Sequence, residues 1–464
     1  MLKNSHATSR IRASLRIMPL PKRGDPPKPM RSYLRLWRSQ PEFLTFGVLL
    51  CASASFGQTW FVSLFGGDIR AEFELTHGDF GAIYSLATLA SAVTLVWVGR
   101  LIDRVPLLTF SCAVFAGLAV ASFGVFQATH VVVVAVAMFG LRLCGQGLMT
   151  HIAVTSMARY FDADRGKAIS VATLGFPMAE SLLPLTVVMV TASLGWRDAW
   201  LLWSVAVAGV LLPLSVWLLQ RSRALWDVSR LGDRQPAAGE KAHTSEQGSN
   251  DSSELVGATE SETAIDASPR SWTRTEVLAD PRFHLMLPYL LAPAFISTGI
   301  MFHQVHLVDT KGWTLEWFAS GFIAYGIAKV VASLIGGPLV DRYSARLLFP
   351  TFLLPMGFGV LLLAVSDSPF VGVAFLALSG VTNGLGGPIG GAFWAEVYGT
   401  QHLGAIRALA VSIMVLGSAL SPVMFGWLFD LGATFSLALY GCCIIAVVST
   451  ALAALAMRTS AAPR

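Results

Sequence analysis

Twelve apolar runs, each close to the length of a membrane-spanning helix, constrain this chain more than any other feature. A helix needs about 20 mostly apolar residues to cross the hydrocarbon core of a bilayer. No run alternates polar and apolar residues with period two, so we predict an all-α membrane protein with 12 transmembrane helices and not a β-barrel. The runs are 42–66, 80–101, 106–128, 131–157, 168–193, 198–219, 282–307, 317–340, 347–366, 369–397, 404–429 and 433–457.

The composition is that of a chain whose surface faces lipid. Of the 464 residues, 54% are hydrophobic and 13% are charged, whereas a soluble protein carries about 25% charged residues. The five cysteines lie inside apolar runs, without the spacing of a metal site or a disulfide framework. We therefore expect no metal and no cofactor. The sequence also shows no catalytic triad and no nucleotide-binding motif, so we do not expect an enzyme.

The segments outside the runs divide the chain into five parts. Residues 1–41 form a basic, Pro-rich arm, and residues 220–281 form a linker whose polar composition buries too little surface to fold. We predict that the arm and most of the linker are disordered. The two bundles of six runs then cover 42–219 and 282–457, and a short cytoplasmic tail follows at 458–464.

Loop charges predict the orientation of the chain in the membrane. Basic residues gather in the loops after the even-numbered runs, and the opposite loops are poor in Lys and Arg. By the positive-inside rule, both termini and the linker face the cytoplasm, and the protein lies in the cytoplasmic membrane. A basic arm also suits nucleic acid, but its place just before an apolar run favours a membrane anchor. We expect no nucleic-acid partner.

One short phrase occurs twice, as "GRLIDR" at 99–104 and as "GPLVDR" at 337–342. Each copy follows the second run of its half, and the copies lie 238 residues apart. The same offset relates Tyr160 to Tyr398. A register shared by separate places indicates that the two halves are copies of one six-helix unit. Parallel repeats of this kind build transporters.

These motifs resemble the major facilitator superfamily, whose loop between helices two and three carries G-x-x-x-D-R. The segments "GLRLCGQG", which contains Arg142, "RYFDADRGKA" and "GWRDAW" are also similar to this family. The resemblance covers nearly all of 42–457 and implies two halves that rock about a central site. Val105 and Pro106 replace the glycine and basic residue of the family in the first copy. The resemblance implies a gate at Gly99, Asp103, Arg104, Gly337, Asp341 and Arg342.

The repeated phrase also has a physical role that can be argued without the family. Asp103 and Asp341 end apolar runs, where a carboxylate can accept hydrogen bonds from a helix N-terminus or from an Arg. Gly99 and Gly337 allow a neighbouring helix to approach closely. Contacts that form in one conformation and break in another make a gate. The alternative is a plain loop that anchors the membrane topology.

Three ionisable residues, Arg142, Glu180 and Lys329, lie near the middle of predicted spans. Each lies about 12 residues into its run, or about 18 Å deep, and a charge at that depth usually marks a transport pathway. Arg142 and Lys329 come from opposite halves, and two cations favour an anionic substrate such as a carboxylate. Glu180 either balances Arg142 in a structural pair or carries a proton in symport.

Uncharged polar residues at mid-depth complete the predicted site. Gln58 of the first run and Asn383 of the tenth join Arg142 and Lys329 as predicted substrate-binding residues. The Gly- and Pro-rich stretch 383–393 predicts a bent helix along the cavity. Four residues are weaker candidates, one indole at mid-depth and three histidines near the ends of runs: Trp60, His151, His303 and His306.

Together these features predict a secondary transporter of a small organic anion, such as a monocarboxylate, that works by alternating access. Proton coupling through Glu180 stays open. Lys329 is similar in kind to cationic residues in the C-terminal half of monocarboxylate and oxalate–formate carriers. The alternatives are a proton-driven multidrug exporter and a non-transporting membrane receptor or scaffold. We expect a monomer whose partners are the lipid bilayer, the substrate and, for symport, protons.

Overall fold

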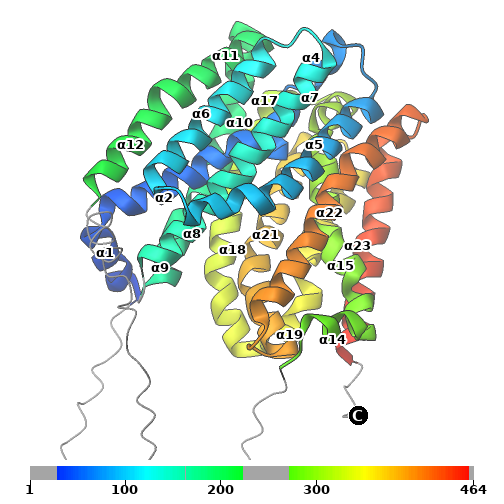
Figure 1. Cartoon of the computed structure of the whole chain (residues 1–464). Coiled ribbons are helices and arrows are strands. Elements are labelled where there is room, and N and C mark those ends of the chain that lie inside the picture. Colours follow the sequence, from blue (N-terminus) through cyan, green and yellow to red (C-terminus); the bar gives the residue numbers. More distant parts are fainter. Residues whose placement is uncertain (1–28, 162–163, 223–270, 459–464) are drawn as a thin grey trace, which may run out of the picture.

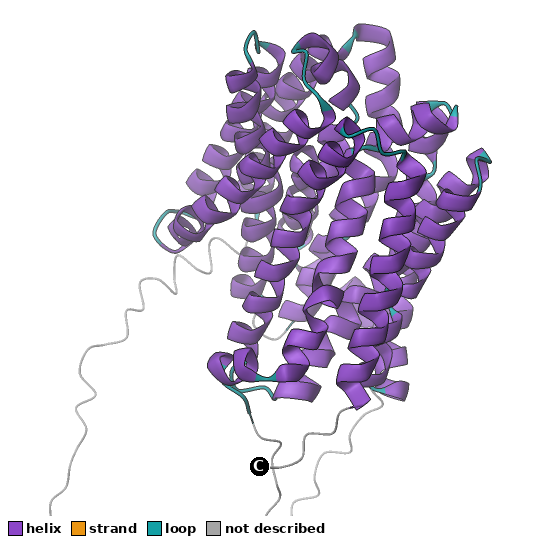
Figure 2. Cartoon of the chain, turned by 90° about the vertical axis from the view of Figure 1, so that its right-hand side faces the viewer, coloured by secondary structure: helices purple, strands orange, loops and turns teal. Residues whose placement is uncertain are grey.

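The computed structural model describes residues 29–161, 164–222 and 271–458, and all regular structure in these ranges is helical. Figure 1 shows the helices as two bundles side by side, one coloured blue to green and the other yellow-green to red. Figure 2, turned by 90°, shows that short loops join the helices at the two ends of the bundles. The described chain therefore consists mainly of long helices that run between the two ends of the bundles.

Each half contains six membrane-spanning stretches, some of them built from more than one helix. The helices of the first half are α2 (Pro41–Ser53), α3 (Thr59–Ser63), α4 (Gly66–Glu72), α5 (His77–Val98), α6 (Leu107–Phe126), α7 (Val131–Gly140), α8 (Thr150–Tyr160), α9 (Arg165–Thr173), α10 (Gly175–Leu194), α11 (Trp196–Ala206) and α12 (Leu212–Arg221). Those of the second half are α15 (Pro281–Phe302), α16 (Gln304–Lys311), α17 (Leu315–Ser320), α18 (Phe322–Tyr343), α19 (Ala345–Leu348), α20 (Leu354–Val365), α21 (Pro369–Tyr398), α22 (Leu403–Asp430) and α23 (Phe435–Arg458).

Eleven helical stretches of the described chain are long and apolar enough to cross a membrane. The remaining predicted span is the first run, where the apolar helix Pro41–Gly57 is shorter. It ends early because Gln58 is extended, with φ −77° and ψ 151°, and α3 begins only at Thr59. With this interrupted span, the fold has the 12 predicted spans in two halves. The protein is an integral, multi-pass membrane protein.

Large apolar side chains cover the outside of both bundles. Val120, Leu334 and Phe370 are 70%, 73% and 70% exposed. In water a continuous surface of this kind would drive association. In a bilayer it faces acyl chains that are as apolar as the side chains themselves. The fold therefore needs an apolar medium, lipid or detergent, around these side chains.

The two halves meet along two pairs of helices, α5 with α22 and α10 with α18. Glycines make these crossings close. A Cβ atom on Gly426 would lie 2.3 Å from the backbone oxygen of His77, and one on Gly81 would lie 2.5 Å from that of Pro422. Small residues let helix backbones approach in this way within a membrane.

Two segments that the sequence predicts to be disordered contain helices. α1 (Pro29–Ser39) lies in the predicted arm, and α14 (Arg274–Ala279) lies in the predicted linker. The prediction was wrong at α1, because it averaged over a long polar segment, whereas α14 falls in the part of the linker for which only most residues were predicted to be disordered. Each helix brings one apolar side chain, Leu36 or Val277, into the buried core. The rest of the arm and linker, 1–28 and 223–270, and the tail from 459 lie outside the described residues.

We expect Gly426→Ala to lower the melting temperature of the detergent-solubilised protein, because the added methyl group overlaps the backbone of His77. Overpacking of this kind costs about 1–3 kcal/mol. Gly441→Ala is the matched control, since its Cβ would meet no atom within 4 Å. A fluorescence-detected thermal melt of both variants measures the difference. Equal melting temperatures would show that the α5–α22 crossing is loose.

Candidate functional site

The interruption of the first span creates the centre of the candidate site. Between α2 and α3 the chain forms a 3₁₀ turn, Ala54–Gly57, and then the extended residue Gln58. The oxygen of Gly57 accepts a hydrogen bond from Nη1 of Arg142, at 2.9 Å. A Cβ atom on Gly57 would lie 2.2 Å from the backbone oxygen of Leu141, so only glycine fits beside this neighbour.

Arg142 lies in a π-helical segment, Leu141–Met149, that joins α7 to α8. Single π-helical segments are rare and often mark functional sites. The side chain is buried, with 5% of the residue exposed, and its guanidinium lies 5.0 Å from the centre of the Tyr84 ring. Its Nε–H has no hydrogen-bond partner, and the guanidinium forms no ion pair with any acid in the described parts of the chain.

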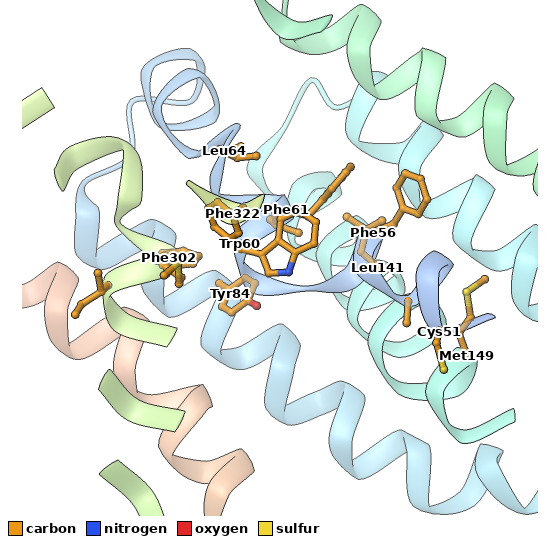
Figure 3. Close-up of a cluster of buried hydrophobic side chains, with 14 of the residues drawn as sticks. Cys51, Phe56, Trp60, Phe61, Leu64, Tyr84, Leu141, Met149, Phe302 and Phe322 are labelled. Carbon is orange, nitrogen blue, oxygen red and sulfur yellow. The ribbon is translucent and has the colours of Figure 1, made fainter. Parts of the chain in front are cut away.

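Aromatic and hydroxyl groups surround this guanidinium. The hydroxyl groups of Thr59 and Tyr84 are hydrogen-bonded to each other at 2.7 Å, which fixes the Tyr84 ring. Figure 3 shows Trp60 beside Tyr84, with Phe302 and Phe322 of the other half nearby. The indole Nε1–H of Trp60 is also buried without a hydrogen-bond partner. Two buried donors of the first half, on Arg142 and Trp60, thus lack an acceptor.

Lys329 and Glu180 form an ion pair that joins the two halves. Nζ of Lys329, on α18, donates to Oε2 of Glu180, on α10, at 2.6 Å. The ammonium group also lies 5.4 Å from the centre of the Tyr325 ring. The alternative pair between Arg142 and Glu180 is therefore not formed, because Glu180 faces the other half. The three deep charges comprise two cations and one carboxylate.

The structure places the four predicted substrate-binding residues in two groups. Gln58 adjoins the Gly57 oxygen that Arg142 binds, and its half-buried side chain makes no hydrogen bond within the described ranges. Asn383, on α21, is exposed and donates from Nδ2 to the oxygen of Ser379. Lys329 lies on the neighbouring α18. The two helices are close at this point, because a Cβ on Gly384 of α21 would lie 2.3 Å from the backbone oxygen of Lys329. Gln58 and Arg142 thus lie together in the first half, and Asn383 and Lys329 lie on adjacent helices of the second.

Hydrogen bonds between the described halves gather toward one end of the molecule, which we call the junction end. It carries α4 and α16. Gln304, fully buried, donates from Nε2 to the backbone oxygen of Trp60 and to Oγ of Ser63, both at 2.8 Å. Oγ of Ser63 donates to the backbone oxygen of Met301 at 2.7 Å. Gln304 and Ser63 were not predicted from the sequence, where their only signal is their polarity inside apolar runs.

Asp430 closes the junction end by capping a helix of the other half. Its Oδ1 accepts from the backbone N–H of His77 at 3.0 Å, and its Oδ2 accepts from that of Gly78 at 2.8 Å. These N–H groups begin α5. A carboxylate at a helix N-terminus satisfies unpaired donors and interacts favourably with the helix dipole. This contact was not predicted from the sequence, because nothing in either segment shows which helix lies opposite.

Three histidines meet beside this cap. The ring centres of His77 and His306 are 4.4 Å apart, and those of His77 and His303 are 5.7 Å apart. His303 is buried, and its Nε2 is hydrogen-bonded to the backbone oxygen of Pro422 at 3.0 Å. Burial and then the positive charge of Arg70 lower the pKa of His306 below its ordinary value, against a smaller opposing effect of Asp309. The junction therefore favours the neutral form of His306.

The six predicted gating residues lie at the opposite end, which carries α1, α19 and Arg458 and which we call the terminal end (Figure 1). Asp103 forms an ion pair with Arg159 of its own half. Arg104, Asp341 and Arg342 are exposed and have no ion pair within the described residues. No hydrogen bond in these ranges joins the two halves at the terminal end.

The two glycines of the repeated phrase do not provide the close helix contacts that we expected. A Cβ on Gly337 would meet no atom within 4 Å, and one on Gly99 would lie 3.4 Å from the ring of His151, an ordinary contact. The close approach occurs one residue earlier, at Gly336, where a Cβ would lie 2.9 Å from Cγ of Pro388. Gly99 contributes its backbone oxygen, which is hydrogen-bonded to Nε2 of His151 at 3.0 Å.

Two similar halves around deep charges, closed at one end by contacts between them, define a secondary transporter. The chain belongs to the Major Facilitator Superfamily, whose model matches residues 47–324 and 294–464. This confirms the family resemblance of the sequence. A member of this family is a transporter of small molecules and not an enzyme. Among curated proteins, no relative of the sequence is found.

Solved structures of other transporters share the fold. A bacterial homolog of the human lysosomal transporter Spinster, inward-facing and occupied, is 14% identical with a TM-score of 0.61, over 94% of this chain and 98% of its own. The unoccupied inward-facing form of that homolog gives the same values. The nucleoside transporter NupG, in a mutant form, is 14% identical with a TM-score of 0.62, over 89% of this chain and 99% of its own. At this identity the likeness concerns the fold alone.

We expect Glu180→Gln and Lys329→Met each to destabilise the protein, because each leaves one deep charge without its partner. Breaking a buried pair costs about 3 kcal/mol, and less where solvent reaches it. The double variant carries no deep charge at this contact and should recover most of the lost stability. Thermal melts of the single and double variants measure the coupling. Additive losses in the double variant would show that the two side chains do not interact.

We expect acid to loosen the junction end. The pKa of His306 is lower in this closed arrangement than in water. Neutral His306 therefore stabilises the closed junction above about pH 6.5, and this stability is lost as the pH falls toward the lowered pKa. Spin labels at Ala71→Cys and Thr310→Cys, two exposed positions on α4 and α16, report the separation by double electron–electron resonance. The distance should lengthen between pH 8 and pH 5, and less in His306→Gln. An unchanged distance in both proteins would refute this role.

Proposed function

We propose that the protein carries a small organic anion, such as a carboxylate, across the cytoplasmic membrane by alternating access. The observation that supports this most is Arg142, a buried guanidinium with no acid beside it in the described chain. A charge in this position costs several kcal/mol unless something pairs with it. A substrate carboxylate supplies the missing partner, and the unpartnered N–H groups of Arg142 and Trp60 supply donors for it.

The pairing of the second cation, Lys329, determines how much charge a ligand must neutralise. Lys329 is already neutralised by Glu180, so the three deep charges leave one net positive charge for a ligand to neutralise. A monoanion matches that charge. In this proposal a proton on Glu180 frees Lys329 to hold the anion as well, which couples substrate and proton in symport. Gln58 and Asn383 provide polar contacts on the two sides.

The two ends of the molecule support alternating access. The junction end is held by Asp430, Gln304 and Ser63, while the terminal end has no hydrogen bond between the described halves. If the basic loops mark the cytoplasm, the terminal end and both chain ends are cytoplasmic, and the structure faces inward.

The gate at the terminal end forms, in this proposal, when the halves rock together. Asp103 then exchanges Arg159 for the N-terminus of a helix in the other half, and Asp341 makes the equivalent contact. Arg104 and Arg342 hold the same carboxylates, and Gly99 and Gly337 lie at the closing surface. The free state of Asp341 in this conformation is what a released latch requires.

The oligomeric state and the two alternative functions can be judged from the same features. The proposal needs only one copy of the chain, because the pair Lys329–Glu180 already joins the two halves of that chain, and it needs no nucleic acid. Export of drugs driven by protons receives less support, since the buried guanidinium of Arg142, which has no acid beside it in the described chain, favours an anion over a neutral or cationic drug. A role as a receptor or scaffold would not explain why ionisable side chains lie in the middle of the spans.

Uptake into proteoliposomes tests the proposal. A panel of labelled carboxylates, measured with and without an inward proton gradient, should include at least one anion that accumulates. Arg142→Gln should slow its uptake about 10- to 100-fold, because a hydrogen bond to a charged group contributes about 1.5–3 kcal/mol. Arg221→Gln is the control, since that guanidinium lies on the Trp217 ring at the end of α12. An Arg142→Gln variant that folds and transports at the wild-type rate, or a panel without any transported anion, refutes it.

A further inference from the structure

The second half contains a recess that the deep charges do not occupy. It is lined by α15, by Phe349 and Phe352 just before α20, and by α21 and α22, and it has a volume of about 340 Å³. That volume is within the range of small-molecule sites, roughly 300–1,000 Å³. Arg407, near the start of α22, lines it, as does Asn383 at the middle of α21. The recess therefore extends from the terminal end toward the level of Lys329.

One wall of the recess has no side chains. Gly387, Gly390 and Gly391 of α21 line it, and a Cβ on any of them would meet no atom within 4 Å. No packing constraint within the described chain therefore requires glycine there. The rings of Phe352 and Trp394 also line the recess. A flat backbone surface together with aromatic rings suits a planar ring, which gains both burial and offset stacking.

An indole donor reaches the recess. Trp394, which lines it, is 5% exposed, and its Nε1–H makes no hydrogen bond in the described chain. Thr382 is 1% exposed, and its hydroxyl group is already engaged, because Oγ1 accepts from the N–H of Met356 at 3.0 Å. Donors in a protein interior usually have partners. The indole N–H of Trp394 is therefore available to an oxygen acceptor on a ligand.

Charge selects the kind of ligand. Arg407 is exposed and forms no ion pair in the described ranges. No acidic residue lines the recess. A guanidinium at the rim of an apolar cavity binds a carboxylate while the rest of the ligand enters the cavity.

From these observations we propose that the recess is a binding subsite for an aromatic carboxylate, with its ring against the glycine wall and its carboxylate on Arg407. This rests on the proposed function, since it names the class of anion that is carried. The subsite lies nearer the terminal end than Lys329 does, so a substrate that enters from the terminal end reaches it before the deep charges. Short aliphatic acids lack the ring and gain nothing from the recess.

A comparison of the KM values for two acids, benzoate and acetate, tests this subsite. We expect wild-type proteoliposomes to take up labelled benzoate with a KM at least tenfold below that for acetate. Gly387→Leu fills the recess and should raise the benzoate KM at least tenfold while the acetate KM changes less than twofold. Gly441→Leu, on α23, is the control, since its Cβ also has open space, and it should change neither value. Gly391→Leu serves as the second filling variant if Gly387→Leu does not yield monodisperse protein.

The outcomes separate this inference from the proposed function. If acetate is transported but benzoate has no advantage, or if both filling variants alter the two acids equally, the subsite is refuted and the anion carrier stands. If neither acid nor any other carboxylate is transported, the proposed function fails and the subsite fails with it. Arg407→Gln should raise the benzoate KM at least fivefold, and an unchanged KM removes the guanidinium from the assignment.

Discussion

The cost of placing charge in an apolar medium governs this structure. An ionised side chain at mid-membrane depth needs a partner, or its desolvation destabilises the fold. Glu180 and Lys329 meet that need with each other, and in doing so they fix where α10 meets α18. Arg142 meets it only in part, with one carbonyl oxygen and one aromatic ring. The positive charge that remains there is the feature on which the proposed anion site rests.

The two halves make close contacts at the junction end, but these contacts can be broken at a small cost in free energy. Asp430 caps α5 with two hydrogen bonds to backbone N–H groups, and glycines such as Gly426 allow backbones to touch. Each polar atom in the cap lies near an end of the bundle, where water can replace a lost partner. Separation then costs only the difference between protein and water hydrogen bonds, which is small. A carrier that must open this end many times requires such a contact.

The sequence was sufficient for the features that depend on one segment at a time. Span positions follow from apolar length, the duplication follows from the shared offset of Asp103 and Asp341, and the deep charges follow from their place in a run. The partners of those charges depend on how two halves pack, so the pairing of Glu180 was beyond reach. The cap by Asp430 was missed for the same reason. The only sign of the interruption at Gln58 in the sequence is a few polar residues in the first run.

The interruption of the first span has a mechanical consequence. The oxygen of Gly57 has no helical donor and relies on the guanidinium of Arg142. An anion that draws this guanidinium toward itself strands the oxygen in an apolar medium, at a cost of about 1–3 kcal/mol. The oxygen recovers a donor if the chain rewinds into a continuous helix from α2 into α3. In the proposed function, anion binding and the shape of the first span are thereby linked through a single backbone atom.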